Sequence, residues 1–184
     1  MLKITLDTNI LGEDKMNILR RAIKSLDVDL VTISVSDREI RGSYIQPLNK
    51  QLLETAVWDE SEWDKAVWGG DTLETFILGE SELGKGRLGS PKSSSLFEEI
   101  LKIVSNESFP VVGSRDNLTK RQKHDLRDAM ILEAHAREKR DILISDDKKA
   151  YIGKDGKKRI ILEKLCGTRI MTFDEFLSWI QSQK

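Results

Sequence analysis

The chain begins with the stretch Leu2-Lys3-Ile4-Thr5-Leu6-Asp7-Thr8-Asn9, in which apolar and polar residues alternate up to a carboxylate. This alternation predicts a β-strand over 2–6. Asp7 then stands at the carboxyl end of the strand, where a buried acid is costly unless a positive group lies against it. A strand-ending turn or a helix cap would also explain an aspartate here, so both explanations stay open for Asp7.

Three further stretches place carboxylates beside apolar segments. They are Ser36-Asp37-Arg38-Glu39, Asp125-Leu126-Arg127-Asp128 and Ser145-Asp146-Asp147. If all four stretches converge, they form an oxygen-lined pocket suited to a hard divalent cation such as Mg²⁺ or Mn²⁺. The choice within each pair of neighbouring acids stays open, because helix caps, first-turn acids and exposed helical glutamates are common.

The remaining sequence predicts helices that alternate with strands. Helices are expected over 16–26, from 37, over 47–57, over 95–104 with a capping box at Ser95, over 119–140, and after a second capping box at Thr172. Further strands are expected over 30–33, 142–144 and 170–171, and a turn signal at 154–157 predicts a small hairpin between 151–152 and 160–162. This order predicts an α/β fold, a three-layer α/β/α sandwich with a mostly parallel central sheet. Sites in such folds collect at the carboxyl ends of strands.

The composition favours one domain over 1–184, since 184 residues can bury a sizeable core. The net charge of −1 gives no global nucleic-acid signature, so any basic surface must be local. The single Cys166 excludes an internal disulfide and a cysteine metal cluster. The sequence has no apolar run of the roughly 18 residues that a membrane span needs and no secretory signal, so we expect a cytoplasmic protein without membrane contact.

A Trp- and Gly-rich central segment, about 58–95, is less typical of a compact domain. Trp58, Trp63 and Trp68 recur at a spacing that fits neither a helix nor a strand, and 79–95 predicts a long loop. The tryptophans could stack on unpaired bases, but packing in a core or an interface is the favoured interpretation. A homodimer is one hypothesis that follows from it.

The order of the acidic motifs resembles the PIN domain family. The motifs are Leu6-Asp7-Thr8-Asn9-Ile10-Leu11, a Glu after the second strand, Asp128-Ala129-x-Ile131-x-Glu133-Ala134-x-Ala136, Ile144-Ser145-Asp146-Asp147 and the closing Thr172-Phe173-Asp174-Glu175-Phe176-Leu177. The resemblance covers roughly 1–45 and 119–182, and it says little about 58–115.

The resemblance implies a metal-dependent ribonuclease that hydrolyses RNA phosphodiester bonds. Its catalytic and metal-binding acids would be Asp7, Glu39, Asp128 and Asp146, with Asn9, Asp125, Ser145 and Asp147 as supporting or alternative residues. The carboxylates would hold Mg²⁺ or Mn²⁺, which lowers the pKa of a bound water and neutralises charge on the phosphate. His124 and His135 are expected only at the surface or in packing. A small inhibitory protein is a possible partner, as for many members of the family.

Two basic clusters flank the predicted pocket. The residues expected to bind RNA, most simply single-stranded RNA, are Lys120, Arg121, Lys123, Arg127, Lys148 and Lys149. A solvated surface face would explain either cluster taken alone.

Two alternatives to the ribonuclease stay open. A phosphatase of the haloacid-dehalogenase type also begins with a strand and an aspartate, but it needs a second Asp where this chain has Asn9. A non-catalytic protein that keeps the PIN fold and binds RNA or a protein partner is the other alternative.

Overall fold

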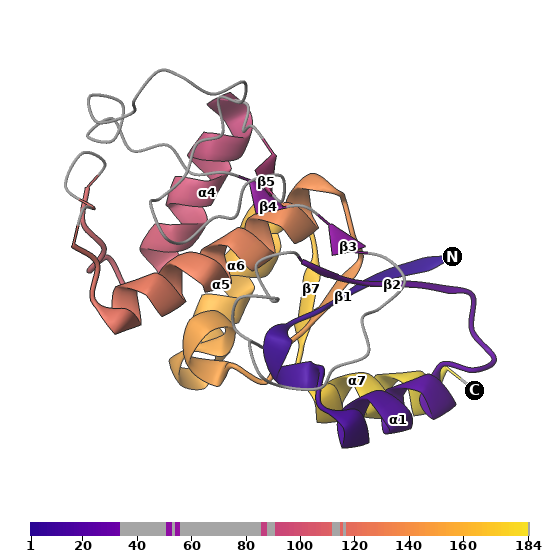
Figure 1. The fold of residues 1–184 in the computed structure, drawn as a ribbon. Helices are drawn as coiled ribbons and strands as arrows, with labels where there is room; N and C mark the ends of the chain where they lie inside the picture. The colour runs from indigo at the N-terminus through magenta and orange to yellow at the C-terminus, as the bar shows by residue number, and fades with distance from the viewer. Residues whose placement is uncertain are drawn as a thin grey trace.

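A computed structural model describes residues 1–33, 91–111 and 117–183 of the chain, together with Arg115 and the backbone of three short strands (Figure 1). These strands are β3 (Gln51–Leu52), β4 (Glu54–Thr55) and β5 (Gly86–Arg87). The predicted helix from 37, the candidate ligand Glu39 and the three central tryptophans lie outside the described residues.

A parallel sheet with β1 (Leu2–Leu6) at its centre organises the fold. Its order is β3-β2-β1-β6-β7, with β2 (Val28–Ile33), β6 (Ile142–Ile144) and β7 (Arg169–Met171), and each of its strand pairings is parallel. Strands β4 and β5 pair separately, also in parallel. The predicted α/β class and the mostly parallel sheet are therefore confirmed.

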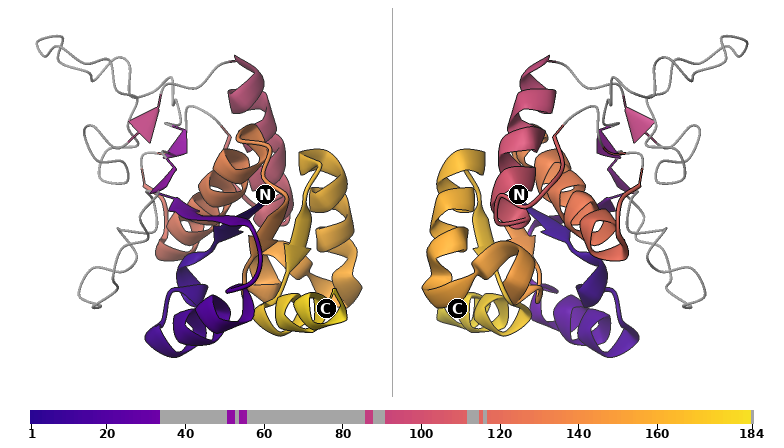
Figure 2. Two further views of the ribbon diagram at one scale, coloured as in Figure 1. Left: turned by 90° about the vertical axis from the view of Figure 1, so that its right-hand side faces the viewer. Right: turned by 90° about the vertical axis from the view of Figure 1, so that its left-hand side faces the viewer.

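Helices pack against the sheet through two separate apolar clusters (Figures 1 and 2). The helices α1 (Glu13–Ala22) and α7 (Phe173–Ser182) share one cluster, and α4 (Pro91–Val104), α5 (Lys120–Arg137) and α6 (Lys157–Cys166) share the other. Strand β6 serves both, because successive side chains of a strand point to opposite faces. Ile142 and Ile144 join the first cluster, and Leu143 joins the second.

Side-chain caps fix the beginnings of two helices that carry or support the site. Thr119 and Gln122 form a capping box at the start of α5, and Thr172 and Glu175 form another at the start of α7. Each box satisfies two backbone N–H groups that a helix end otherwise leaves unpaired. The capping box predicted at Thr172 is thus confirmed, while α5 begins one residue after its predicted start.

The predicted hairpin over 151–162 is wrong. The chain instead forms a π-helical turn (Lys148–Ile152), a short 3-10 turn (Lys154–Gly156) and then α6. The turn signal itself is real, since Asp155 and Gly156 both have positive φ, but it introduces a helix. Leu162 and its partly buried neighbours Leu165 and Cys166 pack into the cluster shared with α4 and α5. Their helical spacing decides the structure here, although the β-branched Ile160 and Ile161 before them favour a strand.

Other boundaries also differ from the sequence-based predictions. Helix α4 begins at Pro91, so Ser95 lies inside the helix and part of the predicted 79–95 loop is helical. Proline suits a first helical position, where its missing N–H is not needed. Within the predicted helix over 47–57, β3 and β4 are strands, because backbone pairing of β3 with β2 extends the sheet edge. Helix α1 begins three residues earlier than predicted and ends four residues earlier.

Among the helices in the described part of the chain, none combines the length and apolar character that crossing a membrane requires.

A buried histidine joins the centre of the sheet to α5. His135 is fully buried, and its Nδ1 lies 2.8 Å from the Thr5 hydroxyl of β1, while its Nε2 hydrogen-bonds the Thr168 hydroxyl. Because the Thr168 hydroxyl also donates to the Asp141 carbonyl, it accepts from Nε2, and a neutral ring satisfies both contacts. Burial, and then the nearby Arg140, lower the pKa of His135 to about 3.

We predict that His135 makes the fold sensitive to acid. Its folded-state pKa lies below the value in the unfolded chain, so the unfolded state binds the extra proton and stability falls as pH drops below about 6.5. The contribution lost between pH 7 and pH 4 is about 3 kcal/mol. Urea denaturation at both pH values, for wild type and His135→Asn, measures it. The variant is less stable at pH 7 but should show a shallower pH dependence, and an equal dependence in both proteins would contradict the prediction.

Candidate metal centre

A pocket of about 640 Å³ opens where β1 and β6 end beside α5. Its lining residues are Asp7, Thr8, Asn9, His124, Asp128, Asp146, Asp147, Lys148 and Lys149. The fold therefore gathers acids from three of the four stretches that the sequence singled out. The fourth candidate, Glu39, lies outside the described residues.

Asp7 is held rigidly at the end of β1. Its side chain is buried, Oδ1 accepts from the Thr8 backbone N–H at 2.7 Å, and Oδ2 accepts from Asn9 Nδ2 at 2.7 Å and from the Ser145 hydroxyl. The same carboxylate caps a short 3-10 turn (Thr8–Ile10). Asp7 is thus both a helix cap, as one interpretation of the sequence had it, and a pocket acid.

Asn9 and Ser145 connect the ends of β1 and β6. Asn9 Oδ1 accepts from the Asp146 backbone N–H at 3.0 Å, and the Ser145 hydroxyl accepts from the Asp147 backbone N–H at 3.0 Å. Both residues also donate to the Asp7 carboxylate. These hydrogen bonds fix the direction in which the loop after β6 leaves the sheet, and the supporting role that the PIN resemblance implied for both residues stays a prediction.

Asp128 is, like Asp7, a buried acid of the pocket lining. Its residue is 4% exposed, and Oδ2 lies 2.9 Å from His124 Nδ1. Among the described residues, its other oxygen, Oδ1, has no hydrogen-bond partner. Burial raises the pKa of Asp128 to about 7; the His124 hydrogen bond opposes this, and the charges of Asp7 and Asp147 add to it. A cation in the pocket would relieve this repulsion.

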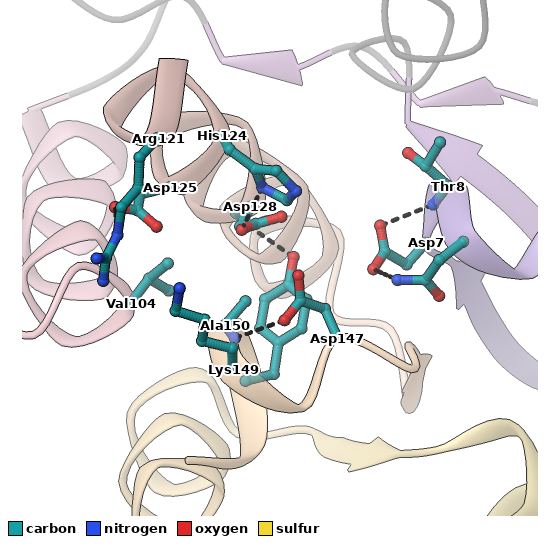
Figure 3. Close-up of polar contacts among 12 residues, drawn as sticks. Asp7, Thr8, Val104, Arg121, His124, Asp125, Asp128, Asp147, Lys149 and Ala150 are labelled. Atoms are coloured by element: carbon teal, nitrogen blue, oxygen red, sulfur yellow. Dashed lines mark hydrogen bonds and ion pairs between the residues drawn. The ribbon is translucent and has the colours of Figure 1, made fainter. Parts of the chain in front are cut away.

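Asp147 completes a group that fits a metal ion. One oxygen, Oδ1, accepts from the Ala150 backbone N–H at 2.8 Å and so caps the π-helical turn. One ligand atom each from His124, Asp128 and Asp147 lies within 4.8 Å of the others. In Figure 3, Asp147 lies between Asp128 on α5 and Asp7 at the end of β1. Two carboxylates and an imidazole are ordinary ligands for a divalent cation.

His124 is the member of this group that the sequence-based prediction missed. It was expected only at the surface or in packing, and 56% of its side chain is indeed exposed. The available signal was its position four residues before Asp128, since residues at this spacing share a helix face.

Asp146 faces the helices as well as the pocket. Its Oδ1 accepts from the Phe173 backbone N–H at 2.9 Å, and its Oδ2 pairs with Lys15 Nζ at 2.7 Å. Burial alone would raise its pKa, but the bonds from Lys15 and Phe173 outweigh it and hold the pKa below the usual range. Asp146 therefore ties the end of β6 to α1 and α7, while Asp147 stands in the metal-binding group.

Of the residues expected to bind RNA or to support the site, some line the pocket and others do not. Lys148 and Lys149 line it, and no other residue expected to bind RNA does so among those described. Asp125 does not line the pocket either. Its Oδ2 lies 4.0 Å from Arg121 Nε, one helical turn earlier on α5. Burial raises the pKa of Asp125, against the opposing charges of Arg121 and His124.

Neither protein-family models nor curated proteins match the chain. The geometry of the pocket is therefore the basis on which a function can be proposed.

The different surroundings of Asp146 and Asp147 predict different consequences of losing each charge. Asp146→Asn should lower the free energy of unfolding by about 1 kcal/mol in chelator, because the Lys15 ion pair is lost. Asp147→Asn keeps an oxygen that can cap the turn, so its stability should stay close to wild type, while its Mn²⁺ affinity should fall at least tenfold. Urea denaturation and Mn²⁺ titration of both variants measure this. Equal stabilities, or a greater loss of Mn²⁺ affinity in Asp146→Asn, would contradict the assignment.

Proposed function

We propose that the protein is a metal-dependent ribonuclease of the PIN type, with a three-layer α/β/α fold and a Mg²⁺ or Mn²⁺ ion. One observation carries the proposal: His124, Asp128 and Asp147 bring ligand atoms within 4.8 Å of one another in a pocket that also holds Asp7. This pocket lies at the carboxyl ends of neighbouring parallel strands, where α/β proteins place their sites. The choice of RNA as substrate comes from the resemblance to the PIN family.

The chain's own groups have distinct tasks in this proposal. Asp128 and Asp147, with His124, hold the cation, and the fixed Asp7 carboxylate adds negative charge on the β1 side of the pocket. Asn9 and Ser145 keep Asp7 from rotating. A bound divalent cation supplies an activated water and neutralises charge that develops on a phosphodiester.

Two lysines on the pocket lining suit an anionic substrate. Lys148 and Lys149 are exposed, follow Asp147 directly and line the pocket, so they add positive charge to its edge. Positive charge here offsets the repulsion between a phosphate backbone and the acidic pocket. This arrangement favours a nucleic-acid substrate over a neutral small molecule.

The ribonuclease proposal predicts that cleavage needs both the acids and the metal. Wild-type protein should cut an end-labelled, mixed-sequence single-stranded RNA with Mn²⁺ or Mg²⁺, and chelator should abolish cutting. Asp128→Asn and Asp7→Asn should each lower the cleavage rate at least 100-fold, because each removes a charge from the metal environment. Asp174→Asn, an exposed acid on α7 outside the pocket lining, is the matched control and should cut at the wild-type rate.

A second substrate separates the proposal from its alternatives. Hydrolysis of para-nitrophenyl phosphate without RNA cleavage would replace the ribonuclease with a phosphatase. RNA cleavage that survives Asp128→Asn, Asp7→Asn and chelator would assign the activity to a contaminant. RNA or protein binding with no cleavage under any metal would favour the non-catalytic alternative.

The two lysines should contribute to RNA affinity through charge. The double variant Lys148→Ala/Lys149→Ala should bind single-stranded RNA more weakly at low salt. The slope of log K against log salt concentration should decrease in magnitude by about 1.4, since each single-strand phosphate contact contributes roughly 0.7. Fluorescence anisotropy at several salt concentrations, in an Asp128→Asn background that does not cut the RNA, measures the slope. An unchanged slope would place the RNA path elsewhere on the surface.

A further inference from the structure

His124 gives the candidate metal centre a nitrogen ligand among oxygens. It lies on α5 one helical turn before Asp128, and its Nδ1 is 2.9 Å from Asp128 Oδ2. The ring borders the pocket, where it lies within 4.8 Å of ligand atoms of both Asp128 and Asp147. A cation that binds the two carboxylates therefore meets the imidazole as well (Figure 3).

We infer that this site selects a first-row transition-metal ion, of the series from Mn²⁺ to Zn²⁺, over Mg²⁺, and that His124 is the residue that makes the selection. The inference rests on the proposed function only in taking the pocket to hold a metal, and it identifies the class of that metal.

The chemistry of the ligands carries the selection. Mg²⁺ prefers oxygen ligands in near-octahedral geometry and keeps several of its waters, so an imidazole adds little to its binding. Imidazole nitrogen binds Zn²⁺, Ni²⁺, Cu²⁺ and iron well, and the affinity of mixed nitrogen and oxygen sites rises from Mn²⁺ towards Cu²⁺. An all-carboxylate pocket, as the acidic motifs alone suggest, would lack this bias.

The carboxyl of Asp128 is placed on the pocket lining, where it can accept the same cation. It is 4% exposed and lines the pocket, yet its Oδ1 has no hydrogen-bond partner among the described residues. Lys158 is the buried lysine nearby, but its Nζ donates to the carbonyls of Val104 and Lys149 at 2.9 and 2.8 Å. With its ammonium bound to these two carbonyls, Lys158 leaves the Asp128 carboxyl to an external cation, which His124 helps to hold.

Equilibrium binding of Co²⁺ and Mg²⁺ to the full chain tests the inference without measuring activity. Wild type should bind Co²⁺ at least 100-fold more tightly than Mg²⁺. In His124→Ala this ratio should fall at least tenfold, mainly through weaker Co²⁺ binding, and the visible spectrum of bound Co²⁺ should change as the nitrogen ligand is lost. His124→Asp should recover Mg²⁺ binding relative to His124→Ala. Lys123→Ala, a neighbour on α5 outside the pocket lining, is the control and should keep the wild-type ratio.

The outcomes separate this inference from the proposed function. If His124→Ala keeps its fold by circular dichroism and also keeps the wild-type ratio and spectrum, the inference is wrong, whether or not RNA is cleaved. If the ratio falls as expected but no RNA is cleaved, the metal assignment stands and the ribonuclease proposal fails. Absence of Co²⁺ binding to wild type would overturn both.

Discussion

The parallel pairing of β1 with β6 is the constraint on which the rest of the structure depends. It brings the carboxyl ends of two strands together, so that Ser145 donates to Asp7 across 138 residues of sequence. Asn9 strengthens the same junction by accepting from the Asp146 backbone N–H. Because β1 and β6 run in parallel, the segments that follow them leave the sheet at the same edge. The backbone N–H and C=O groups of both segments need hydrogen-bond partners there. Three of the side chains that provide these partners, those of Asp7, Asn9 and Asp147, also line the pocket.

Much of the fold could be predicted because its signals are local. The alternating apolar residues of β1 and the short apolar run of β6 predict both strands and their ends. The capping box at Thr172 predicts the start of α7. The expectation that Asp7 and Asp146 stand at strand ends follows from the same patterns. Parallel strands then bring those ends to one edge by topology alone, which is why acids distant in the sequence could be expected in one pocket.

The remaining features depend on contacts that periodicity does not encode. Asp146 and Asp147 are adjacent in sequence, yet Asp146 has Lys15 and the start of α7 as partners, while Asp147 turns towards His124 and Asp128. Only the placement of α1, α5 and α7 decides between them. The segment before α6 shows the same limit: a turn signal fixes where the chain bends, but burial of Leu162 decides that a helix follows.

The acids of the pocket differ in how far neighbouring groups compensate their negative charge. Asp146 meets a lysine and a helix N-terminus, and its pKa falls, so the fold itself stabilises that charge. Asp128 has burial, Asp7 and Asp147 against its charge, while the exposed His124 is the group in its favour among the described residues, and its pKa rises to about 7. A fold that needed only stability would gain from replacing such a carboxyl with an uncharged residue. In the proposed nuclease a bound cation would compensate the charge of Asp128, while Asp146, whose charge the fold already compensates, holds the loop in place.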